Sequence, residues 1–129
     1  MPKSVPLTEQ GGTVTVFTSA ARTATENSAV FHSDGNRGVH LVIDATAAAD
    51  TPSVVFTLQG YSGLGDDYYT LLASAAITGT GTTVLRVFPG STVTANLAAN
   101  DTMPPRWRVI ATHADTDSIT YSVTANLLP

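Results

Sequence analysis

The stretch "SITYSVTANL", residues 118–127, decides the fold class because apolar and polar side chains alternate along it without a break. Side chains of a β-strand point to opposite faces of the sheet in turn, so strict alternation is typical of a strand with one buried face. The apolar positions that would share this face are Ile119, Tyr121, Val123, Ala125 and Leu127. We therefore expect an amphipathic strand here, with its Ser, Thr and Asn side chains exposed.

The composition of the whole chain agrees with this pattern. Only 12% of the 129 residues are charged, which is about half the usual share, and Thr, Ala, Ser and Val are abundant. Val and Thr favour strands because branching at Cβ restricts χ1. A chain of this length fits one domain, and this composition predicts an all-β domain.

Similar alternation elsewhere predicts about eight short strands separated by turn residues. The expected strands are residues 13–19, 23–33, 39–45, 53–61, 68–74, 83–88, 106–113 and 118–127. Because strands that follow one another usually pair, we expect hairpins of 53–61 with 68–74 and of 106–113 with 118–127. The predicted fold is an antiparallel β-sandwich or jelly roll.

Two segments lie outside the strand pattern. Residues 1–12 contain two prolines and a Gly-Gly pair with few apolar residues, which predicts an extended N-terminal arm ahead of a single β-sandwich domain at 13–129. Residues 89–105 form a long connection in which one turn of helix could follow Thr94. Loops of this length are uncommon in compact domains and are often functional.

Several functional classes are disfavoured by composition. The chain has no cysteine, so a disulfide framework and a thiolate zinc site are excluded. With a net charge of −4 and six Lys+Arg, the chain is too poor in positive charge for a nucleic-acid surface. No apolar run approaches the roughly 20 residues of a membrane span, and the first residues lack the apolar core of a secretory signal. We expect a soluble protein made in a cytoplasm.

Two acidic pairs are candidate metal ligands. Asp66 and Asp67 are adjacent between glycines, so their side chains would point apart, and a turn is the favoured interpretation over a metal site or catalysis. Asp115 and Asp117 have better spacing, since alternate residues lie on one side of an extended chain. An Asp-rich tip is nevertheless expected for a hairpin loop. We expect no metal ion at either pair.

The three histidines do not form a catalytic arrangement. His40 and Asp44 would lie about 13 Å apart along one strand, at a rise of about 3.3 Å per residue. His32 and His113 fall near strand ends, where we expect them to be solvated. Since the chain also has no Gly-x-Ser-x-Gly elbow, we expect no catalytic residue and no cofactor.

The faces expected to point outward are not uniformly polar. The apolar residues assigned to them are Val42, Val55, Val84 and Ile110, and three of the six positive charges, Arg86, Arg106 and Arg108, point outward as well. Two explanations stay open. Val and Ile suit strands wherever they lie, or another subunit or a larger surface covers part of this face. Arginine is favoured at such interfaces.

Several motifs occur in an order that resembles a known group of proteins. They are "TAT" (23–25), "VHLVIDATA" (39–47), "TPSVVFTLQ" (51–59), "YYTLLAS" (68–74) and "RWRVIATHADTDSITYSVTA" (106–125). In this order they resemble the small β-sandwich virion structural proteins of tailed bacteriophages. The resemblance extends from about Arg22 to Leu127, and it includes no catalytic motif.

This resemblance implies a structural role at the surface of the phage head, as a decoration or cement protein that binds the major capsid protein. Tail, neck or connector roles are alternatives, because the same sandwich recurs there. A homo-oligomer is expected, a trimer more than a dimer, since such proteins sit at symmetry points of the capsid. The residues that we expect to make contacts are Lys3, Val5, Leu7, Arg86, Arg106, Arg108, Leu127 and Leu128.

A recognition module for host-surface glycans is a further alternative. Sugar sites need exposed aromatic platforms, and the candidates are Tyr61, Tyr68 and Tyr69, which flank the loop after the fourth expected strand. Trp107, the only tryptophan, is assigned to the core, which disfavours this alternative.

Overall fold

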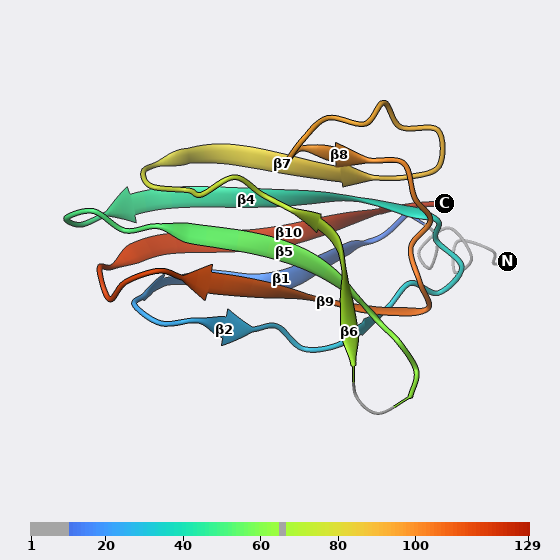
Figure 1. Cartoon of the computed structure of the whole chain (residues 1–129), viewed down its shortest axis with the longest axis horizontal. Helices are drawn as coiled ribbons and strands as arrows, with labels where there is room; N and C mark the ends of the chain where they lie inside the picture. The colour runs from blue at the N-terminus through green and yellow to red at the C-terminus, as the bar shows by residue number, and fades with distance from the viewer. Residues whose placement is uncertain (1–10, 65–66) are drawn as a thin grey trace, which may run out of the picture.

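The computed structural model describes residues 11–64 and 67–129, and the described chain is all β (Figure 1). The expected arm contacts Lys3, Val5 and Leu7 lie outside the described residues, as does Asp66. No helix long and apolar enough to cross a membrane occurs in the described part of the chain. The strands are β1 (Thr13–Arg22), β2 (Glu26–Asn27), β3 (Phe31–His32), β4 (Gly38–Ala48), β5 (Val54–Tyr61), β6 (Tyr68–Ala73), β7 (Gly81–Val87), β8 (Ala98–Ala99), β9 (Arg106–His113) and β10 (Ile119–Leu128).

These strands form two packed layers, as the prediction of a β-sandwich required. Sheet A has the order β1-β10-β4-β7-β8, and sheet B has the order β2-β9-β5-β6 with β3 also paired to β9. All pairs are antiparallel except β7 with the two-residue β8. The expected hairpin of 53–61 with 68–74 is confirmed as β5 and β6.

The core lies between the two sheets and is made by the alternating residues. Alternate residues are buried from Val39 to Ala45 in β4, Val54 to Gly60 in β5, Trp107 to Ala111 in β9 and Ile119 to Leu127 in β10. The predicted inward faces of these strands are confirmed. The largest fully buried side chains are Trp107, Tyr121 and Phe56. Phe56 of sheet B meets Tyr121 of sheet A edge to face, with ring centroids 4.9 Å apart, so aromatic packing joins the layers directly.

The expected hairpin of 106–113 with 118–127 is wrong. β9 pairs with β5 in sheet B, whereas β10 lies between β1 and β4 in sheet A. Alternation shows that each strand has one buried face, but it does not show in which sheet the strand lies. The connection at 114–118 therefore crosses from one layer to the other, as the β4–β5 connection at 49–53 also does (Figure 1).

These two crossing connections run beside each other and are joined by hydrogen bonds. The amide of Ala114 donates to the carbonyl of Ser53 at 2.9 Å, and the amide of Ala49 donates to the carbonyl of Ser118 at 2.9 Å. We call this pair of connections, residues 49–53 and 114–118, the paired arches. They close the end of the sandwich opposite the C-terminus (Figure 1).

Two other expectations need correction. Residues 23–33 do not form one strand but two separate two-residue strands, β2 and β3, which both pair with β9. No turn of helix follows Thr94, because Asn96 adopts a positive φ of 63° and ends any right-handed turn. Thr94 instead forms a β-bridge with Ala98 around a tight turn.

Candidate functional site

One end of the sandwich gathers both ends of the described chain, and we call it the terminal end. The amide of Gly11 donates a hydrogen bond to Asn36 Oδ1 at 2.8 Å. The amide of Leu127 donates to the carbonyl of Gly12 at 2.8 Å. The start of β1 and the finish of β10 are therefore held together beside the β3–β4 loop, residues 33–37.

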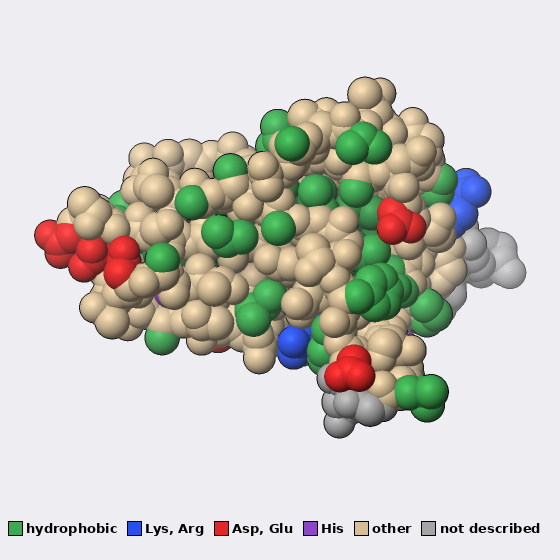
Figure 2. Space-filling model, in the orientation of Figure 1, with side chains coloured by type: hydrophobic (Ala, Val, Ile, Leu, Met, Phe, Trp, Pro, Cys, Tyr) green, Lys and Arg blue, Asp and Glu red, His purple; other side chains and the backbone are tan. Residues whose placement is uncertain are grey.

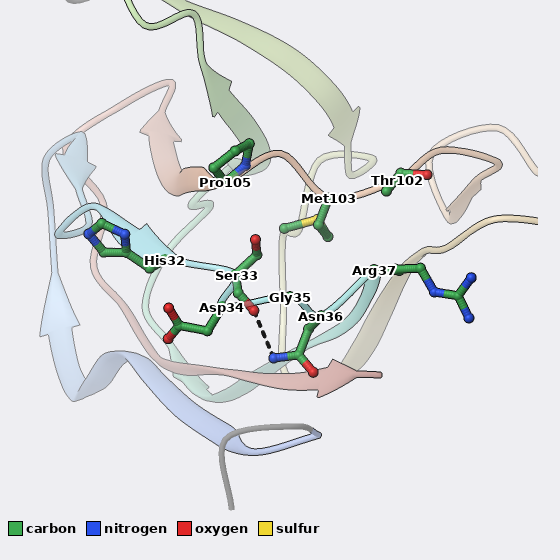
Figure 3. A pocket seen from close by; sticks show the side chains of 9 residues that line it. All are labelled: His32, Ser33, Asp34, Gly35, Asn36, Arg37, Thr102, Met103 and Pro105. Atoms are coloured by element: carbon green, nitrogen blue, oxygen red, sulfur yellow. Dashed lines mark hydrogen bonds between the residues drawn. The ribbon is translucent and has the colours of Figure 1, made fainter. Parts of the chain in front are cut away.

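A hollow of about 430 Å³ opens beside this loop (Figure 3). It is lined by the β3–β4 loop and by the chain that leads into β9, and its residues are His32, Ser33, Asp34, Gly35, Asn36, Arg37, Thr102, Met103 and Pro105. Asn36 is buried, and its Nδ2 donates to the carbonyl of Ser33 at 2.7 Å. The amide of Met103 donates to the carbonyl of Arg37 at 2.9 Å, so the two walls are joined.

The ionisable groups of this hollow do not converge. Figure 3 shows the Arg37 side chain pointing away from His32 and Asp34. In the ranges 11–64 and 67–129, no three His, Asp or Glu side chains gather closely enough to hold a metal ion. The hollow thus combines a polar loop with an apolar wall of Met103 and Pro105.

A second hollow, of about 270 Å³, adjoins the first. Its walls come from the start of β4, the turn after β7 and the end of β10, and its residues are Arg37, Gly38, Phe88, Pro89, Leu128 and Pro129. Arg37 lines both hollows. Leu128 therefore lies at a surface where a contact is possible, whereas Leu127 is only 7% exposed and packs in the core.

The three outward arginines do not form one patch. Arg86 projects from sheet A beside His40, its partner in the β4–β7 register, and the half-buried Val42 and Val84 face each other further along. Burial lowers the pKa of His40, and the nearby Arg86 cation lowers it further. Arg106 and Arg108 project from sheet B, on the opposite side of the molecule.

Arg106 and Arg108 are stacked on tyrosines. The Cζ atom of Arg106 lies 4.5 Å from the ring centroid of Tyr61, and that of Arg108 lies 3.6 Å from the ring centroid of Tyr68. Arg108 Nε also donates to Gln59 Oε1 at 2.8 Å. This outer face of sheet B thus has a cationic and aromatic surface, which differs from the Thr- and Val-rich outer face of sheet A.

Among the described acidic residues of the two pairs, Asp67, Asp115 and Asp117 take part in hydrogen bonds of their loops. The amide of Ser62 donates to the carbonyl of Asp67 at 2.9 Å and closes the β5–β6 loop. Asp115 Oδ1 accepts from the amide of Asp117 at 3.0 Å. Asp117 Oδ2 in turn accepts from the amide and the hydroxyl of Thr51 at 3.2 and 3.1 Å, across the paired arches. Acidic side chains are visible at this end of the molecule in Figure 2.

His113 was expected to be solvated, and this expectation is wrong. Its Nε2 lies 3.1 Å from the hydroxyl oxygen of Tyr121, and its Nδ1 is buried without a hydrogen-bond partner among the described residues. Burial lowers the pKa of His113, although Asp115 and Glu26 act in the opposite direction. Burial also raises the pKa of Tyr121 to about 12.

This pair is structural, because Tyr121 is fully buried and cannot reach a substrate. Arg22 covers it, with its Cζ 4.7 Å from the Tyr121 ring centroid and its Nε 3.1 Å from Glu26 Oε1. The position of His113 could have been predicted, since it follows Trp107, Val109 and Ala111 at the same parity. The contact between Arg22 and Tyr121 could not be predicted, because these residues are 99 positions apart in the sequence.

Known proteins give no significant match to this chain. No family model matches it, and neither a curated protein nor a solved structure matches at a significant level. The likeness to phage virion proteins therefore stays an expectation that rests on the quoted motifs. The function of the chain is best inferred from the two hollows of the terminal end and from the outer faces of the two sheets.

Proposed function

We propose that this chain is a non-enzymatic virion structural protein of a tailed phage, which binds the outer surface of the assembled head and bridges neighbouring capsid subunits. The observation that carries the proposal is the terminal end. Two adjoining hollows flank Arg37 there, next to Gly11, the residue to which residues 1–10 are attached. The candidate docking surface is therefore next to the point at which the candidate arm joins the sandwich.

The rest of the molecule suits a static role. Buried aromatic rings join the sheets, and hydrogen bonds join the paired arches at the far end. A protein that binds only the closed shell stabilises that shell by mass action, so many copies with modest affinity act together. The half-buried valines of sheet A, Val42 and Val84, are the candidate contact between copies in a homo-oligomer, with a trimer favoured over a dimer.

The test is to mix the purified protein with undecorated mature capsids. We expect saturable, stoichiometric binding and a rise in the temperature at which the capsids open. Arg37→Glu, at the junction of the two hollows, should weaken binding at least about tenfold. Thr116→Glu, which adds a negative charge to the exposed tip of an arch, is the control and should bind normally.

Two outcomes would contradict head decoration. One is the absence of both stoichiometric binding and added heat resistance. The other is self-assembly of the purified protein into rings or tubes, which would instead favour a tail, neck or connector component.

A further inference from the structure

The outer face of sheet B has a third hollow. It shares His32 with the first hollow of the terminal end and no residue with the second. Its volume is about 300 Å³, and its residues are Val30, His32, Tyr61, Tyr68 and Arg106. They come from β3, β5, β6, β9 and the residue just before β3. Four strands and a connection thus converge on a site of which the sequence indicates only the two tyrosines.

One wall of this hollow is aromatic. Tyr61 and Tyr68 are partners in the β5–β6 register, and their ring centroids lie 5.3 Å apart at an interplanar angle of 58°. Both rings are half-buried, so each is held by the sheet and still partly open. Tyr69 takes no part, because its ring end lies over Gly60 on the core-facing side of the hairpin.

The second wall is the cationic side chain of Arg106, next to Arg108 on the same strand. Arg106 and Arg108 stack on the two tyrosine rings, and Gln59 accepts a hydrogen bond from Arg108. The one ion pair formed within the described ranges joins Arg22 to Glu26, so neither of these arginines is neutralised by a described carboxylate. A pre-positioned guanidinium with free N–H groups is the natural partner of a carboxylate.

The form of the site favours a sugar over a peptide. Of the strands that line the hollow, β5 and β9 have a hydrogen-bonded neighbour strand on both sides, so a peptide cannot add to either of them as a further strand. Recognition at these two central strands must therefore use side chains. A pyranose ring offers an apolar C–H face to a tyrosine, and its volume suits a pocket at the small end of the range for ligand sites.

We propose that this Tyr–Arg hollow binds a sugar residue that carries a carboxylate, as part of an acidic glycan. The carboxylate would pair with Arg106, and the apolar face of the ring would pack on Tyr61 and Tyr68. The inference concerns the isolated chain, so it holds or fails independently of binding to a phage head.

Calorimetric titration of the folded protein tests this. The acidic probes are sialyllactose and a glucuronate-containing disaccharide, with the methyl esters of both and lactose as uncharged counterparts. We expect saturable one-to-one binding of at least one acidic probe, and binding of its ester weaker by about tenfold or more, because the ester keeps the ring and loses the charge.

Variants locate the site. Arg106→Gln should weaken binding by about tenfold or more, since Arg106 is exposed and its loss leaves the core intact. Tyr68→Leu should also weaken it, by removing a ring on which the sugar packs. Arg86→Gln is the matched control, because it removes an exposed strand arginine from the opposite sheet and should leave binding unchanged. Circular dichroism melting checks that each variant folds.

Four results would overturn the proposal. They are the lack of saturable binding for both acidic probes, equal binding of acid and ester, undiminished binding by folded Arg106→Gln, and binding of a Glu-rich peptide as tight as that of the sugar. The last result would instead assign the surface to acidic proteins.

Discussion

At the scale of single residues, Gly38 shows how closely the backbone is packed where β4 begins. A Cβ atom at this position would lie 2.6 Å from Phe88 Cβ and 2.8 Å from the carbonyl oxygen of Val87. The second neighbour is backbone of a paired strand and cannot move aside without disturbing the β4–β7 ladder. Glycine is therefore required here by space rather than by an unusual φ.

Gly38→Ala should lower the free energy of unfolding by about 1–3 kcal/mol, the usual cost of overpacking. Urea denaturation measures this loss. Gly79→Ala is the control, because nothing lies within 4 Å of its added Cβ, and it should change stability little. Equal stability of the two variants would contradict the tight approach of β4 to β7.

The His113–Tyr121 contact predicts acid sensitivity. Because the pKa of His113 is lowered in the folded state, the unfolded chain binds more protons below about pH 6.5, and the free energy of unfolding falls as the pH is lowered. His40, whose pKa is lowered as well, acts in the same direction. We expect the melting temperature to fall between pH 7 and pH 5, and to fall less in the double variant His40→Gln/His113→Gln. If the melting temperature fell equally with pH in the parent protein and in the double variant, the two histidines would not be the cause of the acid sensitivity.

The raised pKa of Tyr121 predicts a loss of stability at high pH as well. Its folded pKa of about 12 lies above the ordinary value of 10.0, so its stabilising effect is present below pH 10 and is lost as the pH rises towards 12. Absorbance at the tyrosinate band, followed together with circular dichroism, should show a late ionisation that coincides with unfolding. Tyr121→Phe should lack this step, and ionisation ahead of unfolding would contradict the burial of the hydroxyl.

At the scale of elements, the faces of the strands could be predicted, but the partner of each strand could not. A period of two assigns every second residue of β4, β5, β9 and β10 to the core, because one sheet face is buried. The period of two is the same whichever sheet a strand belongs to. The pattern therefore could not predict that the connection 114–118 crosses between the layers. The hydrogen bonds to this connection come from 49–53, a segment far away in the sequence.

Asp117→Ala tests the bond between the paired arches. It removes the acceptor of the amide and hydroxyl of Thr51, and it should cost about 0.5–1.5 kcal/mol of unfolding free energy. Amide hydrogen exchange should speed up at Thr51. Asp44→Ala removes the same charge from an exposed position of β4 and should cost less. Unchanged exchange at Thr51 would show that the arches do not depend on this carboxylate.

At the scale of the whole molecule, composition and alternation predict the sandwich, but they do not predict which residues meet on its outer faces. The sequence predicts that Arg106 and Arg108 point outward, and it places Tyr61 and Tyr68 on a hairpin. It does not predict that the arginines stack on the tyrosines, because this needs β9 to lie next to β5, which is a long-range pairing. The separation of Arg86 onto the other sheet has the same cause.

The closeness of Gly11 to the last residue opens a route to a circular permutant. A Cβ on Gly11 would lie 3.5 Å from Pro129 Cδ, so a linker of a few residues can join these positions. New ends cut at Gly63, in the exposed β5–β6 loop, would interrupt neither sheet. The permuted chain should therefore keep its far-ultraviolet spectrum and melt within about 4–8 °C of the parent. A tag or passenger domain would then sit beside the tyrosine hairpin rather than at the end that carries the two adjoining hollows.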